Sequence, residues 1–189
     1  MKKLIFLIMM LFLNLSNIAN AADTYTFDPD HSYIQWHISH FGFSNPSGKW
    51  MVNGSLTLDQ KNPQLSKVTA TIKLSDIITG INDLDKHLKG ALFFNVAQYP
   101  LATFTSDKVI PHGDSAKVQG MLTLHGVSKP VTLDIKLNKS GISPITNKMT
   151  AGFTGSTTLK RSDFGITTLL PGVGDDVKIN IEAEAVKNE

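Results

Sequence analysis

The chain has 189 residues, with 18 Lys or Arg, 16 Asp or Glu and no cysteine. The missing cysteines exclude disulfides, thiolate metal sites, thiol catalysis and a lipidated cysteine. Because no Lys or Arg cluster accompanies the small net charge of +2, the composition gives no support to nucleic-acid binding.

Residues 1–21 have the three parts of a secretory signal peptide. Lys2 and Lys3 precede an apolar run over residues 4–13, and the small-residue site Ala-Asn-Ala follows at residues 19–21. The apolar run is too short to span a bilayer, which needs about 20 residues. Removing 21 of the 189 residues leaves 168, with a net charge of zero because two lysines are lost. We expect a periplasmic protein without stable membrane insertion, formed by one domain over residues 22–189.

The rest of the chain is dominated by strand-like runs in which apolar and polar residues alternate. The clearest is the stretch 118–137, in which two such runs flank a predicted turn at residues 126–130. One apolar and one polar face per run indicates antiparallel strands. The other runs, in chain order, are 25–28, 32–41, 49–59, 67–75, 102–110, 148–160 and 177–186. About eight such strands form either a sandwich or a closed barrel, and the short connections favour an up-and-down barrel.

Two segments interrupt the alternation. Residues 80–100 contain the one convincing helix, with Asn82 as a plausible N-cap, acidic residues in the first turn and Gly90 at the end. Residues 160–176 form a long, partly apolar connection. We expect both segments to plug or frame a mouth of the barrel.

Short motifs follow one another in order along most of the chain. They are Asp30-His31-Ser32, Gly48 before Trp50, His87-Leu88, Phe93-Phe94 with Tyr99-Pro100, His125-Gly126-Val127 with Lys129-Pro130-Val131, and Arg161 with Asp163-Phe164-Gly165. Together they resemble the YceI-like family of lipocalin-like polyisoprenoid-binding proteins. The resemblance implies an exported, eight-stranded antiparallel barrel with a tunnel for a long-chain isoprenoid or fatty-acyl lipid. Leu84, Trp50 and Asn95 depart from the family pattern, and the first two bear on the tunnel's width or head-group contacts.

The apolar strand faces and the resemblance together predict the ligand-binding residues. Those on strands are Trp36, Ile38, Trp50, Val52, Phe104, Leu122, Leu124 and Phe153, and those in the irregular segments are Phe93, Phe94 and Phe164. His40 follows the apolar face of its strand, so its imidazole would be buried and need a partner, either in the core or on a ligand. We expect any polar head group to meet His40 or His87. Because an eight-stranded barrel either fills its interior or holds one small ligand, a solid core stays open as an alternative.

The sequence shows no pattern typical of a metal site or an enzyme. His37 and His40 lie on opposite faces of one strand, and no HExxH, G-x-S-x-G, Walker or EF-hand spacing occurs. We therefore expect no metal, no cofactor and no catalytic residue. Arg161 and Asp163 are expected to form a structural ion pair at the rim, and His125 to pin the hairpin end.

Two other functions stay open from the sequence alone. The first is a filled-barrel structural or stress-response periplasmic protein that acts through a surface partner. The second is a quinone-linked redox accessory, whose electrons would have to come from the ligand. A homodimer also stays open as the oligomeric state.

Overall fold

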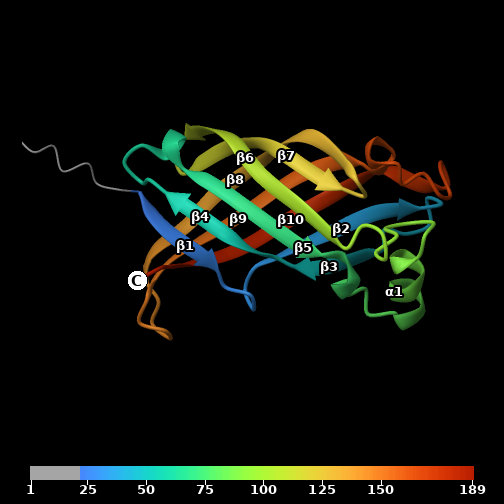
Figure 1. The fold of residues 1–189 in the computed structure, drawn as a ribbon, viewed down its shortest axis with the longest axis horizontal. Helices are drawn as coiled ribbons and strands as arrows, with labels where there is room; N and C mark the ends of the chain where they lie inside the picture. The colour runs from blue at the N-terminus through green and yellow to red at the C-terminus, as the bar shows by residue number, and fades with distance from the viewer. Residues whose placement is uncertain (1–21) are drawn as a thin grey trace, which may run out of the picture.

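The computed structural model describes residues 22–189, and the predicted signal peptide lies outside them. This part of the chain is an antiparallel β-barrel with a short helix at one end (Figure 1). The strands are β1 (Asp23–Phe27), β2 (Tyr33–His40), β3 (Ser47–Met51), β4 (Asn53–Leu58), β5 (Lys67–Lys73), β6 (Leu101–His112), β7 (Ser115–Leu124), β8 (Val127–Ile142), β9 (Met149–Lys160) and β10 (Val173–Lys187). The helix is α1 (Asn82–Lys89), and the connections contain the 3-10 helices η1 (Pro63–Leu65), η2 (Leu74–Asp76) and η3 (Arg161–Phe164).

Ten strand segments fill eight positions around the barrel. β1 and β2 share one position, because β10 pairs with β2 over residues 173–182 and then with β1 over residues 185–187. β3 and β4 share the next position, since only Val52 separates them and they pair with β2 and β1, respectively. The β1–β10 pairing closes the ring. The predicted all-β, eight-stranded antiparallel barrel with one short helix is therefore confirmed.

Strand β7 shows how the alternation in the sequence produces the barrel wall. Val118 and Gly120 are buried on the inner face, whereas Gln119 and Met121 are exposed on the outer face. Successive side chains of a strand point to opposite sides, so a period-two sequence gives the wall one apolar side and one polar side. The hydrophobic faces predicted from the sequence thus point into the barrel.

The turn between β7 and β8 is shorter than predicted. It consists of His125 and Gly126, whose φ angles of 51° and 74° both lie in the left-handed region that a two-residue type I′ hairpin requires. The prediction of a turn over residues 126–130 was wrong, because Pro130 lies inside β8 opposite Met121. Pairing of β8 with β9 begins only at Asp134, so proline occupies a stretch of β8 that has a strand partner on one side alone.

The predicted helix is confirmed over Asn82–Lys89, with a different cap. The N-cap position is Ile81, not Asn82, and no side chain of that residue caps the helix. Asp85 instead fixes the entry to the helix, because its Oδ1 accepts hydrogen bonds from the backbone N and the Oγ1 of Thr79, at 2.9 and 2.6 Å. Gly90 ends the helix as predicted and donates its N–H to the carbonyl of His87.

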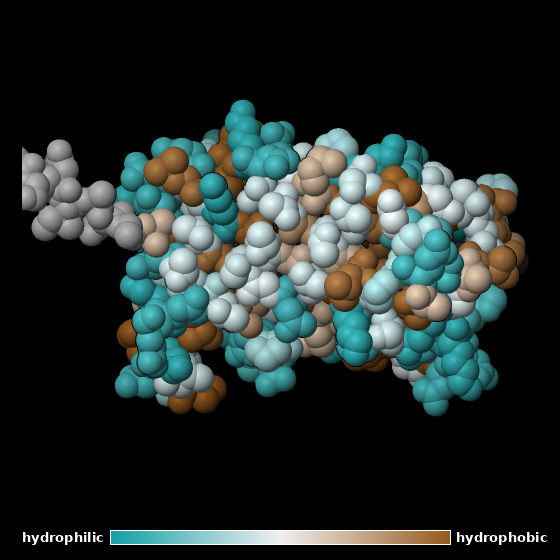
Figure 2. Space-filling view, in the orientation of Figure 1, coloured by the Kyte–Doolittle hydropathy of each residue, from teal (hydrophilic) through white to brown (hydrophobic). Residues whose placement is uncertain are grey.

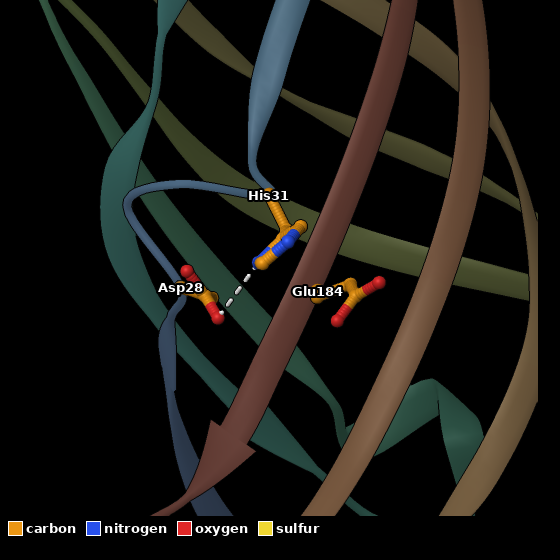
Figure 3. Close-up of side chains that lie close together, drawn as sticks. All are labelled: Asp28, His31 and Glu184. Atoms are coloured by element: carbon orange, nitrogen blue, oxygen red, sulfur yellow. Dashed lines mark hydrogen bonds and ion pairs between the residues drawn. The ribbon is translucent and has the colours of Figure 1, made fainter. Parts of the chain in front are cut away.

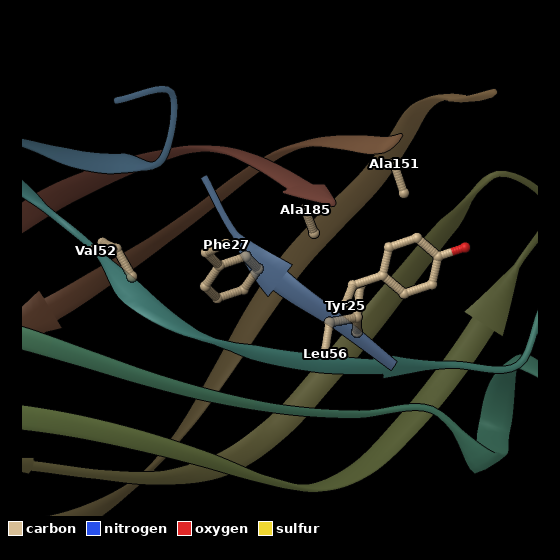
Figure 4. Packing of buried hydrophobic residues seen from close by; sticks show 6 residues of the cluster. All are labelled: Tyr25, Phe27, Val52, Leu56, Ala151 and Ala185. Carbon is tan, nitrogen blue, oxygen red and sulfur yellow. The ribbon is translucent and has the colours of Figure 1, made fainter. Parts of the chain in front are cut away.

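The end of the barrel opposite α1 contains a compact apolar cluster (Figures 1 and 4). Figure 4 shows its side chains gathered around β1, with contributions from β4, β9 and β10. The members are Tyr25, Phe27, Val52, Leu56, Ala151 and Ala185. Because Tyr25, Ala151 and Ala185 have no exposed surface, the barrel is closely packed around these three side chains. Phe27, Val52 and Leu56 of the same cluster border the cavity of the barrel.

Candidate ligand-binding site

An elongated apolar cavity of about 580 Å³ occupies the interior of the barrel. Its volume lies within the range of about 300–1,000 Å³ that is typical of small-molecule sites. Every strand position contributes inward side chains to its wall, and polar or charged residues border it mainly towards the barrel ends. The cavity therefore offers an apolar chain a continuous surface with very few hydrogen-bonding groups.

Many inward residues along the cavity are only half-buried. They border the cavity, so part of their surface stays accessible although they point away from the outer face of the barrel. Examples are Ile38, Ile72, Leu122, Leu124, Val131, Leu133, Leu137, Phe153, Leu159 and Ile181. Side chains of a close-packed core would have lost nearly all of this surface. The structure thus has an open cavity where the sequence left both an open tunnel and a filled core as alternatives.

All thirteen residues predicted to bind a ligand border this cavity. They are Trp36, Ile38, His40, Trp50, Val52, His87, Phe93, Phe94, Phe104, Leu122, Leu124, Phe153 and Phe164. They come from β2, β3, the β3–β4 junction, β6, β7, β9, α1, the segment after α1 and η3. Their contact with a ligand stays a prediction, but the structure brings them to one cavity.

Two tryptophans and a phenylalanine form an aromatic wall beneath α1. The Trp50 ring packs edge-on against Phe94 at 5.1 Å between centroids and lies 6.3 Å from the Trp36 ring. Trp50 Nε1 donates a hydrogen bond of 3.1 Å to the carbonyl of Leu74, which fixes the ring. Trp36 Nε1 is buried without a hydrogen-bond partner among the described residues. Packing alone therefore orients the Trp36 indole, which lies directly on Gly48, where a Cβ would come within 2.6 Å of Cζ2.

His40 and His87 lie at the edge of the cavity, and both are exposed. The interpretation of His40 as a buried imidazole was wrong, because β2 ends at this residue and its side chain reaches the surface. The His40 ring packs edge-on against Phe41, and the His87 ring lies against Phe93, each at 4.8 Å between centroids. These two histidines place polar groups at the rim of the α1 end, with no need for a partner in the core.

The connection between β9 and β10 is held by a buried arginine. Arg161 donates three hydrogen bonds to carbonyl oxygens, from Nε to Gly174 at 2.8 Å, from Nη1 to Ile166 at 2.9 Å and from Nη2 to Val173 at 2.9 Å. Burial lowers the pKa of Arg161, which nevertheless remains charged because its ordinary value is so high. The predicted ion pair with Asp163 was wrong, since Asp163 is exposed and each nitrogen of the guanidinium donates to a backbone carbonyl instead.

Two further contacts fix this connection on the barrel. Asp175 accepts hydrogen bonds from the backbone N and the Oγ of Ser162, at 2.9 and 2.8 Å, and the backbone bond is the main cause of its lowered pKa. His125 Nδ1 lies 3.0 Å from the carbonyl oxygen of Phe164, so the β7–β8 turn is pinned as predicted. The Phe164 ring is consequently buried at the wall of the cavity.

A separate polar cluster lies at the turn between β1 and β2 (Figure 3). His31 Nδ1 is 3.1 Å from Asp28 Oδ2, a hydrogen bond that raises the pKa of His31. The pKa of Asp28 is lowered, mainly because its carboxylate accepts a hydrogen bond from the backbone N of Asp30. Together with Glu184, these side chains offer one metal-ligand atom each within 4.8 Å of one another. Sequence reasoning compared histidines only with each other and missed this cluster, because Glu184 is distant in sequence.

Comparisons with known proteins agree on one family and one fold. A family model described as a YceI-like domain matches residues 25–185. A UPF0312 protein of Pectobacterium atrosepticum is 41% identical over 171 residues, which cover 89% of this chain and 88% of that protein. The crystal structure of Burkholderia cenocepacia BcnA has a TM-score of 0.76 at 22% identity and covers 84% of this chain and 98% of its own.

A second solved structure has the same fold at lower identity. It is described as a polyisoprenoid binding domain from Saccharophagus degradans, and it has a TM-score of 0.67 at 15% identity. The match covers 87% of this chain and 98% of that domain. At 22% and 15% identity, the two structures bear on the fold alone. Within residues 22–189, no helix has the length and apolar character needed to cross a membrane.

Proposed function

This chain belongs to the family of YceI-like domains, and we propose that it is an exported binding protein that holds one long-chain apolar lipid inside the barrel. The observation that carries this proposal is the open apolar cavity of about 580 Å³. An isoprenoid or fatty-acyl chain fits its chemistry, because such a chain offers no hydrogen bonds to a wall that has few. The description of the Saccharophagus degradans domain as polyisoprenoid-binding supports the same ligand class.

The binding energy would come from removing apolar surface from water. Burying about 400 Å² of a lipid chain at about 25 cal/mol per Å² gives roughly 10 kcal/mol before costs. Immobilising a flexible chain takes back a large part of this energy. No cofactor or charge is needed for such binding. We propose carriage, sequestration or storage of the lipid in the periplasm, and binding without catalysis.

We further propose that a polar head group lies at the α1 end of the cavity. His40 and His87 border the cavity there and are exposed, so a head group beside them keeps its contact with water. Phe93 and Phe94 lie next to this position in the segment after α1 and would contact the first part of the chain. A head group in the middle of the tunnel would instead lose its hydrogen bonds to water, at a cost of about 1–3 kcal/mol or more.

The first experiment is mass spectrometry of a lipid extract from the purified protein. We expect one long-chain lipid per chain, or its uptake from vesicles that contain isoprenoid or fatty-acyl lipids. Leu124→Trp fills the cavity without adding polarity and should reduce the lipid recovered per folded chain. Gln119→Trp is the matched control, because Gln119 lies on the same strand but on the exposed outer face.

Circular dichroism would confirm that both variants fold. Equal lipid recovery from Leu124→Trp and wild type would contradict binding in this cavity. A wild-type protein that carries no lipid and takes up none would leave the structural or stress-response alternative as the better hypothesis. The half-buried inner wall gives that alternative less support than the lipid-binding function has.

A further inference from the structure

Apolar side chains are exposed on three separate segments at the α1 end of the barrel. Phe43 is 91% exposed and Phe41 51% exposed in the β2–β3 loop, Leu92 is 66% exposed after α1, and Leu169 is 51% exposed between η3 and β10. We call these four residues the mouth rim. Large exposed apolar side chains that gather in one place are typical of interaction sites and not of an inert surface.

Hydrogen bonds hold the three segments next to one another. The backbone N of Phe41 donates to the carbonyl of Gly172 at 2.6 Å, and Thr168 Oγ1 donates to the carbonyl of Leu92. Leu169 follows Thr168 directly and also borders the cavity. The mouth rim is therefore one surface at the α1 end of the lipid cavity, and Figure 2 shows hydrophobic atoms at this end of the molecule.

The loops that carry most of the mouth rim contain no charged residue. Neither residues 41–46 nor residues 164–174 include Asp, Glu, Lys or Arg. At the other end of the cavity, the bordering residues include the exposed Lys67 and Asp114. Burying a charge in a membrane interface is costly, whereas aromatic and aliphatic side chains favour that position. Exposed apolar side chains such as Leu65 also occur at the other end, but charged side chains border the cavity there, which makes the uncharged loops of the mouth rim better suited to approach a bilayer.

We propose that the mouth rim docks on the surface of a phospholipid bilayer, where lipid enters or leaves the cavity. This inference rests on the proposed function, because a lipid cargo gives an apolar rim at this opening its role. Phe43, at the tip of the β2–β3 loop, is the side chain best placed to enter the acyl region. The charged side chains of α1, such as Lys86 and Asp83, are exposed and would remain at the level of the head groups.

The test uses a variant of the mouth rim and a matched control. Phe43→Ser combined with Leu92→Ser removes two exposed apolar side chains of the mouth rim that do not border the cavity. Ile145→Ser is the control, because Ile145 is 92% exposed in the β8–β9 hairpin, at the end of the barrel away from α1. All variants share one N-terminus, so any contribution of residues 1–21 cancels.

The first measurement is co-sedimentation with vesicles of phosphatidylethanolamine and phosphatidylglycerol. We expect the double variant to lose about tenfold in vesicle partitioning, which corresponds to the transfer free energy of about one apolar side chain. Ile145→Ser should behave as wild type. Absence of wild-type binding, or an equal loss in Ile145→Ser, would overturn the proposal.

The second measurement separates docking from lipid binding. A long-chain polyprenol is offered either in the same vesicles or in detergent micelles, and its uptake per chain is measured by mass spectrometry. We expect the double variant to load normally from micelles but more slowly from vesicles. If the double variant loads from vesicles as fast as wild type does, the result counts against docking. If neither protein loads from micelles, the result counts against the proposed function instead.

Discussion

Replacing Arg161 by methionine should lower the free energy of unfolding by about 3–5 kcal/mol. The arginine is 6% exposed and supplies hydrogen bonds to three carbonyl oxygens, those of Ile166, Val173 and Gly174. Hydrogen bonds from charged donors contribute about 1.5–3 kcal/mol each, so three would give roughly 4.5–9 kcal/mol. Methionine also removes the cost of burying the charge of the arginine, which reduces the expected net loss to about 3–5 kcal/mol.

Urea unfolding followed by circular dichroism measures this loss directly, provided that the m-value is unchanged. Domains are stable by about 5–15 kcal/mol, so the variant should remain folded but lose a large fraction of its stability. At about 2–4 °C per kcal/mol for a domain of this size, its melting temperature should fall by roughly 6–20 °C.

Lys160→Met is the matched control, because Lys160 precedes Arg161 and forms an exposed ion pair with Asp176 at 3.2 Å. Such an exposed pair contributes little to stability because solvent screens it. Arg161→Lys should lie between the two, since one ammonium group cannot reproduce the planar donor fork of a guanidinium. A loss below about 1 kcal/mol in Arg161→Met, which is within the range of ordinary surface changes, would refute the role assigned to these hydrogen bonds.

Three further predictions concern the N-terminus and the polar cluster. N-terminal sequencing of the exported protein should begin at Ala22; a membrane-bound chain that retains Met1 would contradict export with cleavage. The raised His31 pKa and the lowered Asp28 pKa mean that their bond stabilises the fold below the ordinary histidine value of 6.5 and fades as the pH rises through the raised value. His31→Ala should therefore lower the melting temperature more at about pH 5.5 than at about pH 8.5, and an equal effect at both would oppose this view. Elemental analysis after dialysis should find no stoichiometric zinc, iron or copper, and one metal per chain that is lost in His31→Ala would place a site at Asp28, His31 and Glu184.

The barrel could be predicted from the sequence because its main determinant is local. A strand alternates its side chains with period two wherever it lies, so the inner faces that include Trp36, Leu122 and Phe153 follow from the sequence itself. The position of a strand end is not local in this way. The period-two alternation places His40 on the apolar face of its strand, but β2 ends at this residue and its side chain is exposed to water.

Contacts between segments that are distant in the sequence account for the other differences between the predictions and the structure. The acceptors of Arg161 are backbone carbonyls of Ile166 and of the first two residues of β10, five to thirteen residues later. Every residue has a backbone carbonyl, so the sequence does not show which ones accept. An acidic neighbour such as Asp163 can be seen in the sequence, so it was predicted to pair with Arg161. The same reasoning applies to Glu184, which approaches His31 only because β10 passes the β1–β2 turn.

Two glycines on the inner face show how closely neighbouring strands and side chains pack in the barrel wall. At Gly120 a Cβ would lie 2.3 Å from the carbonyl oxygen of Thr105 on the neighbouring strand, and at Gly54 a Cβ would lie 2.1 Å from that of Thr69. Glycine is therefore required where the strands approach so closely, and glycines inside strands are typical of places where a sheet bends to close a barrel. The rings of Phe104 and Phe27 lie over these two glycines, 2.7 and 3.0 Å from where the Cβ atoms would be. A larger side chain at either glycine would therefore disturb the wall, whereas Leu124 borders the cavity itself, which is why Leu124 is the better place to test lipid binding.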